Sequence, residues 1–545
     1  LVHSGRFPLP SSILHCPPMS QDGLPRRTTI STRTKSKTRS PSKSPDSKSK
    51  RAAGSMMRAL KFAAQTVSTM ARAVEKAATD ARRPPIFEAA AEGDVSALCR
   101  AYAEGEDLWE TDLHSNTVLH FACMHNCQPS VRAILVLAGE QSRMWERTND
   151  EGKTPAELTT SDMIVEDLAA FREERPEAVR ATDFKRNEQI IRDKTAIEDV
   201  SHERVLLSLD GGGIRGLVEL QIMLHIENRL GFPLADLVDW VAGTSTGSIL
   251  ALALAQKKPV VWGHQLYFGM VKTIFKPATR GIIPRYDAKE LERMLQKHLG
   301  TGTMEGMAKN VIVTSSDTRS LPPKLVLFRS YAPRVSQEVY QEEGFQSPST
   351  HPAWVAARAS SAAPVYFSPY VLDRQILADG ALCSNNPSSV LLADFFKVRK
   401  IEEMNGVENR DRVFAFISIG TGRDPANDDS APVDVSLCSY TPQAIYDSIK
   451  RSTNLITMFI RQCTNSDGHV IDFPREWALS HGIPFFRLQP RLSNRIKLDE
   501  TDYPRIVEML WQTEMQLRSD LSQWIGQLVK LLQYLHAKRM DMSLV

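Results

Sequence analysis

Residues 243–247 read Gly-Thr-Ser-Thr-Gly, a Gly-x-Ser-x-Gly pentapeptide that requires a sharp turn between a strand and a helix. The preceding run 236–242 favours a short strand, and the following run 248–255 is a good helix former. Glycines on both sides of the serine let the backbone turn and a substrate approach, and the helix directs its positive end at the same spot. We therefore predict that Ser245 is a nucleophile on a strand-to-helix turn.

A second turn, at residues 210–216, reads Asp-Gly-Gly-Gly-Ile-Arg-Gly between a predicted strand at 204–209 and a predicted helix at 217–230. Its Gly-x-Gly-x-x-Gly spacing is typical of a dinucleotide-binding turn, which also needs an acidic residue about 20 positions later. Asp239 is at about that distance, but it lies in the run that leads into the serine turn. The same glycines fit an oxyanion hole, because consecutive glycine N–H groups can point at one anion. A tight turn without a ligand is the third alternative.

A nucleophilic serine needs a base, and the sequence offers two kinds. His469 and His481 lie downstream, as the order in an α/β-hydrolase would require, but neither stands in a context that marks it. Asp379 comes at the end of a predicted strand at 374–377 and precedes Gly380, where its carboxylate is placed to reach a neighbouring turn. An ordinary Asp-Gly turn is the alternative for this pair.

From about residue 204 to residue 486, β-branched runs alternate with helical runs, and the part 503–540 is mostly helical. This alternation predicts an α/β fold with a mainly parallel sheet that is covered on both faces.

The motifs at 210–216, 243–247 and 379–381, in this order, resemble the patatin-like phospholipase family. The stretches 357–364 and 418–422 are also similar to that family, and the resemblance covers roughly residues 204–390. It implies a patatin-like three-layer α/β/α domain and a Ser–Asp dyad that needs no histidine. Burial would have to raise the pKa of the aspartate for it to act as a base, because its ordinary value is about 3.9.

Carried over residue by residue, the resemblance implies roles for eleven positions. Ser245 is the nucleophile, Asp379 is the proton acceptor, and Gly211, Gly212 and Gly213 form the oxyanion hole. The supporting residues of the motifs are Asp210, Arg215, Gly216, Gly243, Gly247 and Gly380. Arg215 steadies the loop or meets a lipid phosphate, with a solvated arginine at the helix start as the alternative. No cofactor and no metal are implied, since the chain has no Asp-rich calcium loop.

The region before this domain divides into four expected parts. Residues 1–55 carry 11 Lys and Arg against two Asp and predict a disordered tail, and 56–83 predict a basic helix or linker. Residues 84–165 resemble degenerate ankyrin repeats, with threonines 117 and 154 opening two units, and 166–203 are expected to be a linker. The catalytic core is expected at 204–400, and 401–545 complete the domain. Repeats before a patatin-like domain resemble, more narrowly, the calcium-independent phospholipase A2 group.

The resemblance therefore implies a calcium-independent lipid acyl hydrolase of the phospholipase A2 type. A nucleotide-binding protein and a catalytically silent ankyrin scaffold are the alternatives. Nucleic acid is not an expected partner, because beyond the tail the chain carries 56 basic and 62 acidic residues. Seven scattered cysteines indicate reduced thiols in an intracellular protein, and Cys123 and Cys127 with nearby histidines are only a weak metal candidate.

The expected partners are a phospholipid membrane surface, contacted peripherally, and a protein or a second copy bound by the repeats. The stretch 266–276 is a candidate membrane-contact helix, with a buried core helix as the favoured alternative. The basic amphipathic stretch 524–539 is a candidate calmodulin target or an ordinary packed helix. The expected location is cytoplasmic and peripheral, with mitochondrial association as an option because the tail faintly resembles a transit peptide.

Overall fold

The computed structural model describes residues 85–179, 181–275, 285–346, 348, 350–425 and 465–543. The predicted tail at 1–55 and the predicted basic helix at 56–83 lie outside the described residues.

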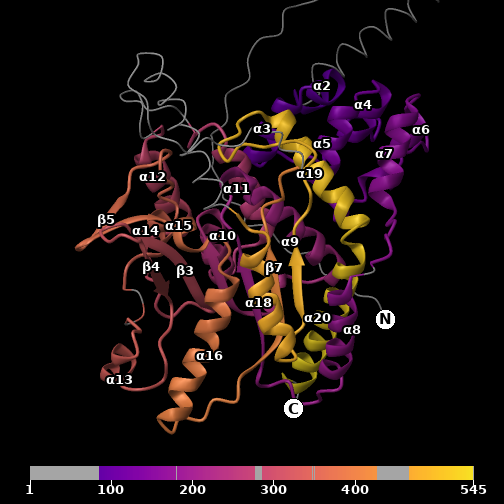
Figure 1. Ribbon diagram of the computed structural model, residues 1–545. Helices are drawn as coiled ribbons and strands as arrows, with labels where there is room; N and C mark the ends of the chain where they lie inside the picture. The colour runs from indigo at the N-terminus through magenta and orange to yellow at the C-terminus, as the bar shows by residue number, and fades with distance from the viewer. Residues whose placement is uncertain are drawn as a thin grey trace, which may run out of the picture. The chain divides into compact units, whose positions relative to one another are not determined.

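A mixed sheet forms the centre of the described fold, and Figure 1 shows β3, β4 and β5 to one side of β7. The strand order is β5-β6-β3-β2-β1-β7-β8, with β4 paired to β3. The strands are β1 (Glu203–Leu209), β2 (Val238–Thr244), β3 (Asn310–Asp317), β4 (Lys324–Arg329), β5 (Tyr370–Leu372), β6 (Gln375–Asp379), β7 (Arg412–Ile419) and β8 (Phe485–Leu488). Strands β3, β2, β1, β7 and β8 run parallel, so the carboxyl ends of β1 and β2 meet at one edge of the sheet.

The antiparallel part of the sheet was not anticipated by the sequence. One of the apolar, β-branched runs of the sequence, 324–328, forms β4, but this strand runs antiparallel to β3, and so does β6. The six residues between β3 and β4 are too few for the crossover that a parallel pair needs. The sheet is therefore mostly parallel with an antiparallel margin.

Helices cover both faces of the sheet, because both faces are apolar along the central strands. Along β1, Val205 and Leu207 join one core cluster while Leu206 joins the other, as the alternation of side chains in a strand requires. The helices of the first face include α9 (Gly216–Leu230), α10 (Thr246–Ala255), α11 (Val260–Met270), α12 (Ala288–Leu299) and α14 (Ala353–Ser360). The helices of the second face include α13 (Gln337–Glu342), α16 (Ser388–Met404) and α18 (His469–Ser480).

The described part of the predicted repeat region is helical. Its elements are α2 (Pro85–Glu92), α3 (Val95–Glu104), α4 (Val118–Met124), α5 (Gln128–Ala138), η1 (Glu140–Ser142), η2 (Met144–Glu146), α6 (Pro155–Leu158) and α7 (Asp162–Arg172). Thr117 and Thr154, the residues on which the repeat was predicted, each form a capping box at the start of a helix. His120 Nε2 lies 3.2 Å from the carbonyl of Lys153 and so ties one unit to the next. Stacking as an ankyrin array remains a prediction.

The expected linker at 166–203 is not an open connection. Helix α7 continues to Arg172, and helix α8 (Thr182–Lys194) packs against α18 and against α20 (Ser522–Ser543). Its Asn187 is fully buried and exchanges two hydrogen bonds with the backbone of Phe485 in β8, at 2.7 and 2.9 Å. Lys194 of the same helix donates to the Val413 carbonyl of β7 at 2.7 Å, so polar side chains anchor this segment to the sheet.

The C-terminal part forms α19 (Tyr503–Arg518) and α20 (Ser522–Ser543), and α15 (Ala381–Ser384), η3 (Gly213–Arg215) and η4 (Leu234–Asp236) complete the described helices. The apolar face of the candidate calmodulin segment is buried, since Leu528, Leu532 and Leu535 are fully covered. In the candidate membrane stretch, Tyr267 and Phe268 are buried as well, which favours the core alternative. No helix within the described ranges has both the length and the apolarity needed to cross a bilayer.

Candidate active site

Ser245 occupies the sharp turn between β2 and α10. Its backbone has φ 52° and ψ −116°, a left-handed conformation that side chains rarely adopt and that turns the chain directly from strand into helix. The turn needs both flanking glycines, because a Cβ on Gly243 would collide with the carbonyl of Gly247. A Cβ on Gly247 would come within 2.5 Å of the Leu209 carbonyl oxygen. The predicted elbow is thus enforced by close backbone packing.

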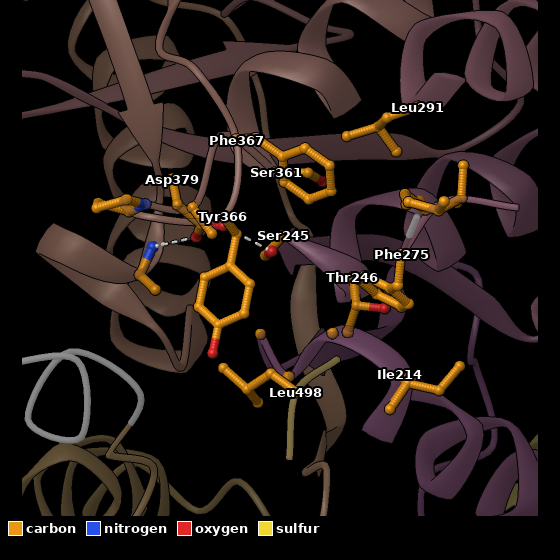
Figure 2. A pocket seen from close by; sticks show the side chains of 18 of the residues that line it. Ile214, Ser245, Thr246, Phe275, Leu291, Ser361, Tyr366, Phe367, Asp379 and Leu498 are labelled. Atoms are coloured by element: carbon orange, nitrogen blue, oxygen red, sulfur yellow. Dashed lines mark hydrogen bonds between the residues drawn. The ribbon is translucent and has the colours of Figure 1, made fainter. Parts of the chain in front are cut away.

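Asp379 is the side chain that faces the Ser245 hydroxyl (Figure 2). Ser245 Oγ donates a hydrogen bond of 2.7 Å to Asp379 Oδ2, and the backbone N–H of Ala381 donates one of 2.8 Å to Oδ1. Asp379 ends β6, which pairs with β3 beyond the end of β2 and so brings the carboxylate to the serine turn. Gly380 is required here, since a Cβ would strike Thr314.

The electrostatics of Asp379 suit a base. Burial raises the pKa of its carboxyl from 3.8 to about 6, against the lowering effect of the hydrogen bonds from Ala381 and Ser245. The carboxylate is therefore mostly ionised at neutral pH and has a much higher proton affinity than an exposed aspartate. A hydroxyl and such a carboxylate at 2.7 Å can transfer a proton when the oxygen attacks an ester.

The glycine loop lies against Ser245, but its three amides are not equivalent. The N–H of Gly211 donates to the Asn385 carbonyl at 3.1 Å and is therefore already engaged. For Gly212 and Gly213, the described part of the chain offers no acceptor to the amide N–H, and both residues line the cavity at Ser245. Of the three oxyanion donors expected from the sequence, only the N–H groups of Gly212 and Gly213 remain candidates.

The peptide between Gly211 and Gly212 is held from its carbonyl side. Asn385 Nδ2 and Thr421 Oγ1 each lie 3.3 Å from the Gly211 carbonyl oxygen and donate to it. Because a trans peptide is planar, with its C=O and N–H pointing in opposite directions, these two bonds also set the direction of the Gly212 N–H. Asn385 and Thr421 are therefore functional candidates whose role beside the glycine loop was not predicted from the sequence.

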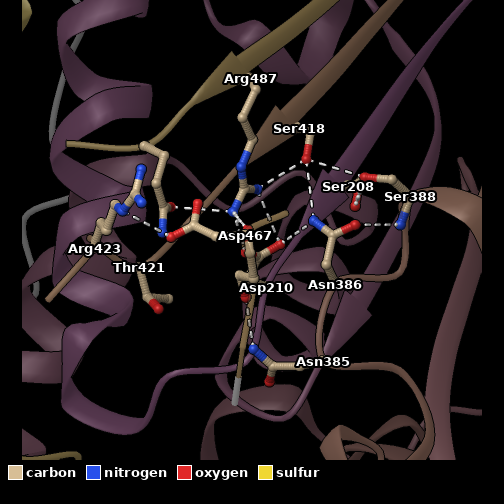
Figure 3. Close-up of polar contacts among 12 residues, drawn as sticks. Ser208, Asp210, Asn385, Asn386, Ser388, Ser418, Thr421, Arg423, Asp467 and Arg487 are labelled. Carbon is tan, nitrogen blue, oxygen red and sulfur yellow. Dashed lines mark hydrogen bonds and ion pairs between the residues drawn. The ribbon is translucent and has the colours of Figure 1, made fainter. Parts of the chain in front are cut away.

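A buried polar network anchors the start of the glycine loop (Figure 3). Arg487 of β8 reaches the fully buried Asp210 with contacts of 2.6 and 3.2 Å, and it also donates to Ser418 Oγ at 2.9 Å. Asn386 Nδ2 donates to Asp210 Oδ1 at 2.6 Å. Sequence reasoning missed Arg487, since a single arginine in a short strand 277 residues after Asp210 carries no local pattern.

Arg215 and Gly216, the last residues of the glycine motif, both pack closely against neighbouring parts of the fold. Arg215 is only 7% exposed and pairs with Asp424 at 2.7 Å, so it is not the solvated arginine considered as an alternative. Gly216 begins α9, where a Cβ would approach Thr246 Oγ1 to 2.6 Å. Thr246 in turn contacts the hydroxyl of Tyr267.

An apolar cavity opens beside Ser245 and Asp379, with a volume of about 970 Å³ that includes the space at its mouth (Figure 2). Its apolar walls are Ile214, Ile249, Met270, Ile274, Phe275, Leu291, Pro364, Phe367, Leu382 and Leu498. The backbone of Ser245 is fixed at its rim by Ser360, whose Oγ accepts the Ser245 N–H at 2.7 Å. A long hydrocarbon fits such a cavity better than a polar ligand does.

The alternatives for the base and the ligand find no support in the geometry. His469 begins α18 and His481 directly follows it; both histidines are exposed and neither lines the cavity. Asp239 is the second residue of β2, where its Oδ2 accepts from the Val205 N–H and from Arg539, both at 2.8 Å. That is the amino end of the strand, roughly 16 Å from the glycine turn at 3.3 Å per residue. The described residues contain no group of three His, Cys, Asp or Glu suited to a metal ion.

Comparison with known proteins agrees with this geometry. Residues 207–392 match the family described as patatin-like phospholipase. The chain is 31% identical to the "Intracellular phospholipase A2" of Caenorhabditis elegans over 483 residues, covering 80% of this chain and 43% of that protein. It is 36% identical to the "85/88 kDa calcium-independent phospholipase A2" of Mus musculus, covering 59% of this chain and 39% of the relative.

A third relative, the "Calcium-independent phospholipase A2-gamma" of Mus musculus, is 27% identical over 54% of this chain and 36% of its own length. Residues 207–392 are thus similar to the patatin-like phospholipase domain. Within that class, the chain's relatives include proteins named calcium-independent phospholipase A2. The chain spans about two fifths of the length of these curated relatives.

Proposed function

We propose that this chain is a calcium-independent lipid acyl hydrolase of the phospholipase A2 type, in which Ser245 is the nucleophile and Asp379 the base. The observation that carries the proposal is the 2.7 Å hydrogen bond from Ser245 Oγ to Asp379 Oδ2 at the wall of an apolar cavity. The relatives named calcium-independent phospholipase A2 support the substrate class.

The first half of the reaction forms an acyl enzyme. Ser245 Oγ attacks the ester carbonyl carbon while its proton passes to Asp379, and the carbonyl oxygen becomes an oxyanion. The N–H groups of Gly212 and Gly213 stabilise that oxyanion, each donor contributing about 2.7–4 kcal/mol in the transition state. When the intermediate collapses, Asp379 returns the proton to the leaving lysolipid or alcohol oxygen, and an acyl-Ser245 ester remains.

The second half repeats these steps with water. Asp379 accepts a proton from the attacking water, the same amides hold the second oxyanion, and the proton returns to Ser245 Oγ as the fatty acid leaves. The acyl chain would lie along Ile249, Phe275 and Leu291 in the apolar cavity. None of these proposed steps needs a metal ion, and for this reason we propose that the reaction is independent of calcium.

The decisive experiment measures release of labelled sn-2 fatty acid from phospholipid vesicles in EDTA. We expect release by the parent chain and a loss of at least about 10⁴-fold in Ser245→Ala and Asp379→Asn, since members of a catalytic unit fail together. Ser480→Ala, an exposed serine on α18, is the matched control and should retain activity. Equal release by Ser245→Ala and the parent would refute the mechanism, provided that thermal melting shows both to be folded.

The other roles expected from the sequence belong to the same proposal. The helices at 84–165 act as an ankyrin-like array that binds a protein partner or a second copy, 204–400 form the catalytic core and 401–545 complete it. The protein works in the cytoplasm or at a mitochondrial surface as a peripheral membrane enzyme. Calmodulin binding at 524–539 would require α20 to leave its packed position, because its apolar face is covered.

A further inference from the structure

The antiparallel strands at the margin of the sheet extend beyond the nucleophile. The pairing of β2 with β3 ends at Thr244 opposite Thr314, and β3 continues for three more residues to Asp317. One edge of β3 pairs with β4 along these three residues. The other edge pairs with β6 there, and with β2 in the preceding part of the strand. The hairpin β5–β6 therefore begins where β2 ends and projects past the Ser245 turn.

The register of these strands places a set of apolar side chains on one face. Leu325 and Ala378 are both paired with Ser316, and Val371 is paired with Ile376, two residues from Ala378. Residues that are paired, or two apart in a strand, share a face of the sheet. Leu325, Ile376 and Val371 thus form an apolar stripe across β4, β6 and β5.

This stripe is open to solvent, whereas the opposite face is covered. Leu325 is 40% exposed, Ile376 41% and Val371 68%, while Leu377 on the other face is fully buried. Leu321, in the turn between β3 and β4, is 96% exposed. That turn is bonded to β6, since the Thr318 N–H donates to the Ile376 carbonyl at 2.9 Å.

Basic side chains lie next to the apolar stripe. Arg319, Lys324 and Arg374 are all exposed, and the guanidinium of Arg319 donates to the carbonyl of Arg374 across the two turns. Asp373 is the exposed acidic residue of the hairpin and lies 3.9 Å from His351. Exposed apolar side chains edged by arginine and lysine match the chemistry of an anionic lipid interface better than that of a polar protein surface.

The stripe is also joined to the wall of the cavity. The short helix α15 packs on β3 and β4, and its Ala381 and Leu382 line the cavity beside Ser245. Cys383 of the same helix contacts the carbonyl of Pro323 in the β3–β4 turn at 3.7 Å. By strand register, Leu325 and Ile376 lie roughly 7 and 13 Å beyond the level of Thr244, at about 3.3 Å per residue.

We infer that Leu321, Leu325, Val371 and Ile376 form the surface with which this protein enters an anionic phospholipid bilayer. Its catalytic significance rests on the proposed function, because the surface would set the mouth of the cavity against the layer from which an acyl chain is drawn. Arg319, Lys324 and Arg374 contact the lipid headgroups around the apolar side chains.

Vesicle binding of the full chain tests the inference without turnover. The probe is sucrose-loaded vesicles of phosphatidylcholine with phosphatidylserine, compared with phosphatidylcholine alone, and the bound fraction is measured by sedimentation. We expect Leu321→Glu combined with Val371→Glu to weaken binding by about tenfold or more. Lys324→Gln combined with Arg374→Gln should remove the preference for the anionic vesicles.

Met404→Glu is the matched control, since Met404 is 73% exposed and lies at the far end of α16, near the amino ends of the parallel strands. It should bind vesicles like the parent.

Equal binding by the double glutamate variant and the parent would overturn the inference, and so would an equal loss in Met404→Glu. A double variant that changes the oligomeric state but not vesicle binding would overturn it in favour of an interface between copies. Because binding is measured directly, an absence of lipase activity leaves this result intact and bears only on the proposed function.

Discussion

Asp210 and Arg487 form a buried two-point ion pair directly behind the glycine loop, with N–O distances of 2.6 and 3.2 Å. Asp210 has no exposed surface, and the Arg487 side chain is 9% exposed. The pair joins the end of β1 to β8, so it ties the loop beside Ser245 to a strand from the last quarter of the chain. A charge this deeply buried is tolerated only because its partner is present.

Replacing Arg487 by leucine should therefore destabilise the fold strongly. The Asp210 carboxylate would keep only neutral donors such as Asn386, and we expect a loss of about 3–5 kcal/mol in the free energy of unfolding. Urea unfolding of both proteins measures the difference. Arg399→Leu removes a partly exposed pair with Glu403 and should cost less than about 1 kcal/mol. Comparable losses in the two variants would contradict a special role for the buried pair.

Thr421 should affect turnover rather than stability. Its hydroxyl donates to the Gly211 carbonyl and so helps to direct the Gly212 N–H, the candidate oxyanion donor. We expect Thr421→Val to lower kcat about 10²-fold or more, with little change in KM, because the oxyanion exists only in the transition state. Thr421→Ser keeps the hydroxyl and should restore most of kcat. If Thr421→Val and Thr421→Ser both keep the kcat of the parent, the Thr421 hydroxyl is not needed and Asn385 alone orients the peptide.

The local part of the site could be predicted from the sequence because the backbone itself demands particular residues there. Ser245 with its two glycines is a single turn between one strand and one helix, and the sequence places both elements close to their observed bounds. The pairing of Ser245 with Asp379 joins residues 134 apart. The place of Asp379 at a predicted strand end made it a candidate, and the family resemblance selected it over the histidines.

The rest depends on contacts that leave no local trace. That the Gly211 amide is already engaged follows from the position of Asn385, which only the folded loop reveals. The apolar run of β4 by itself suits a parallel or an antiparallel strand, and only the short connection from its partner β3 decides the direction. Arg487 and Asn187 become structural residues only through hydrogen bonds to residues distant in the sequence, Asp210 and Phe485.

Asp379→Asn should abolish hydrolysis and raise the free energy of unfolding at neutral and higher pH. Because the pKa of Asp379 is raised from 3.8 to about 6 in the fold, its ionised form opposes folding. This loss of folding free energy is absent below pH 4, grows between pH 4 and 6, and is fully present above pH 6. Its full size is about 3 kcal/mol, because each unit of pKa shift corresponds to about 1.36 kcal/mol. We expect the inactive variant to be more stable than the parent at pH 8 and nearly equal at pH 4. A difference that is constant with pH would show that Asp379 is not a destabilising base.

Activity of the parent should follow the same ionisation. Only the carboxylate form of Asp379 accepts the Ser245 proton, so kcat/KM should rise tenfold per pH unit below about 6 and level off above it. A profile of hydrolysis of a soluble short-chain ester between pH 4.5 and 8, within the range where melting shows the fold intact, measures the midpoint. A midpoint near the ordinary aspartate value of about 4 would indicate an exposed carboxylate and contradict the buried site.

Glu514 should make the junction between α9 and α19 sensitive to acid. Burial alone would raise the pKa of Glu514, but the charges of His225 and Arg518 and the bond from Gln221 outweigh it and lower the pKa from 4.5 to about 2. The stabilisation is therefore complete above pH 4.5 and is lost as the pH falls toward 2, a change of about 3 kcal/mol. Glu514→Gln should be less stable than the parent at pH 7, with a difference that shrinks below pH 4. Glu508→Gln, on the same helix but 40% exposed, is the control and should show a small difference at every pH. A deficit of Glu514→Gln that stays unchanged down to pH 3 would mean that packing, and not the buried charge, holds the two helices together.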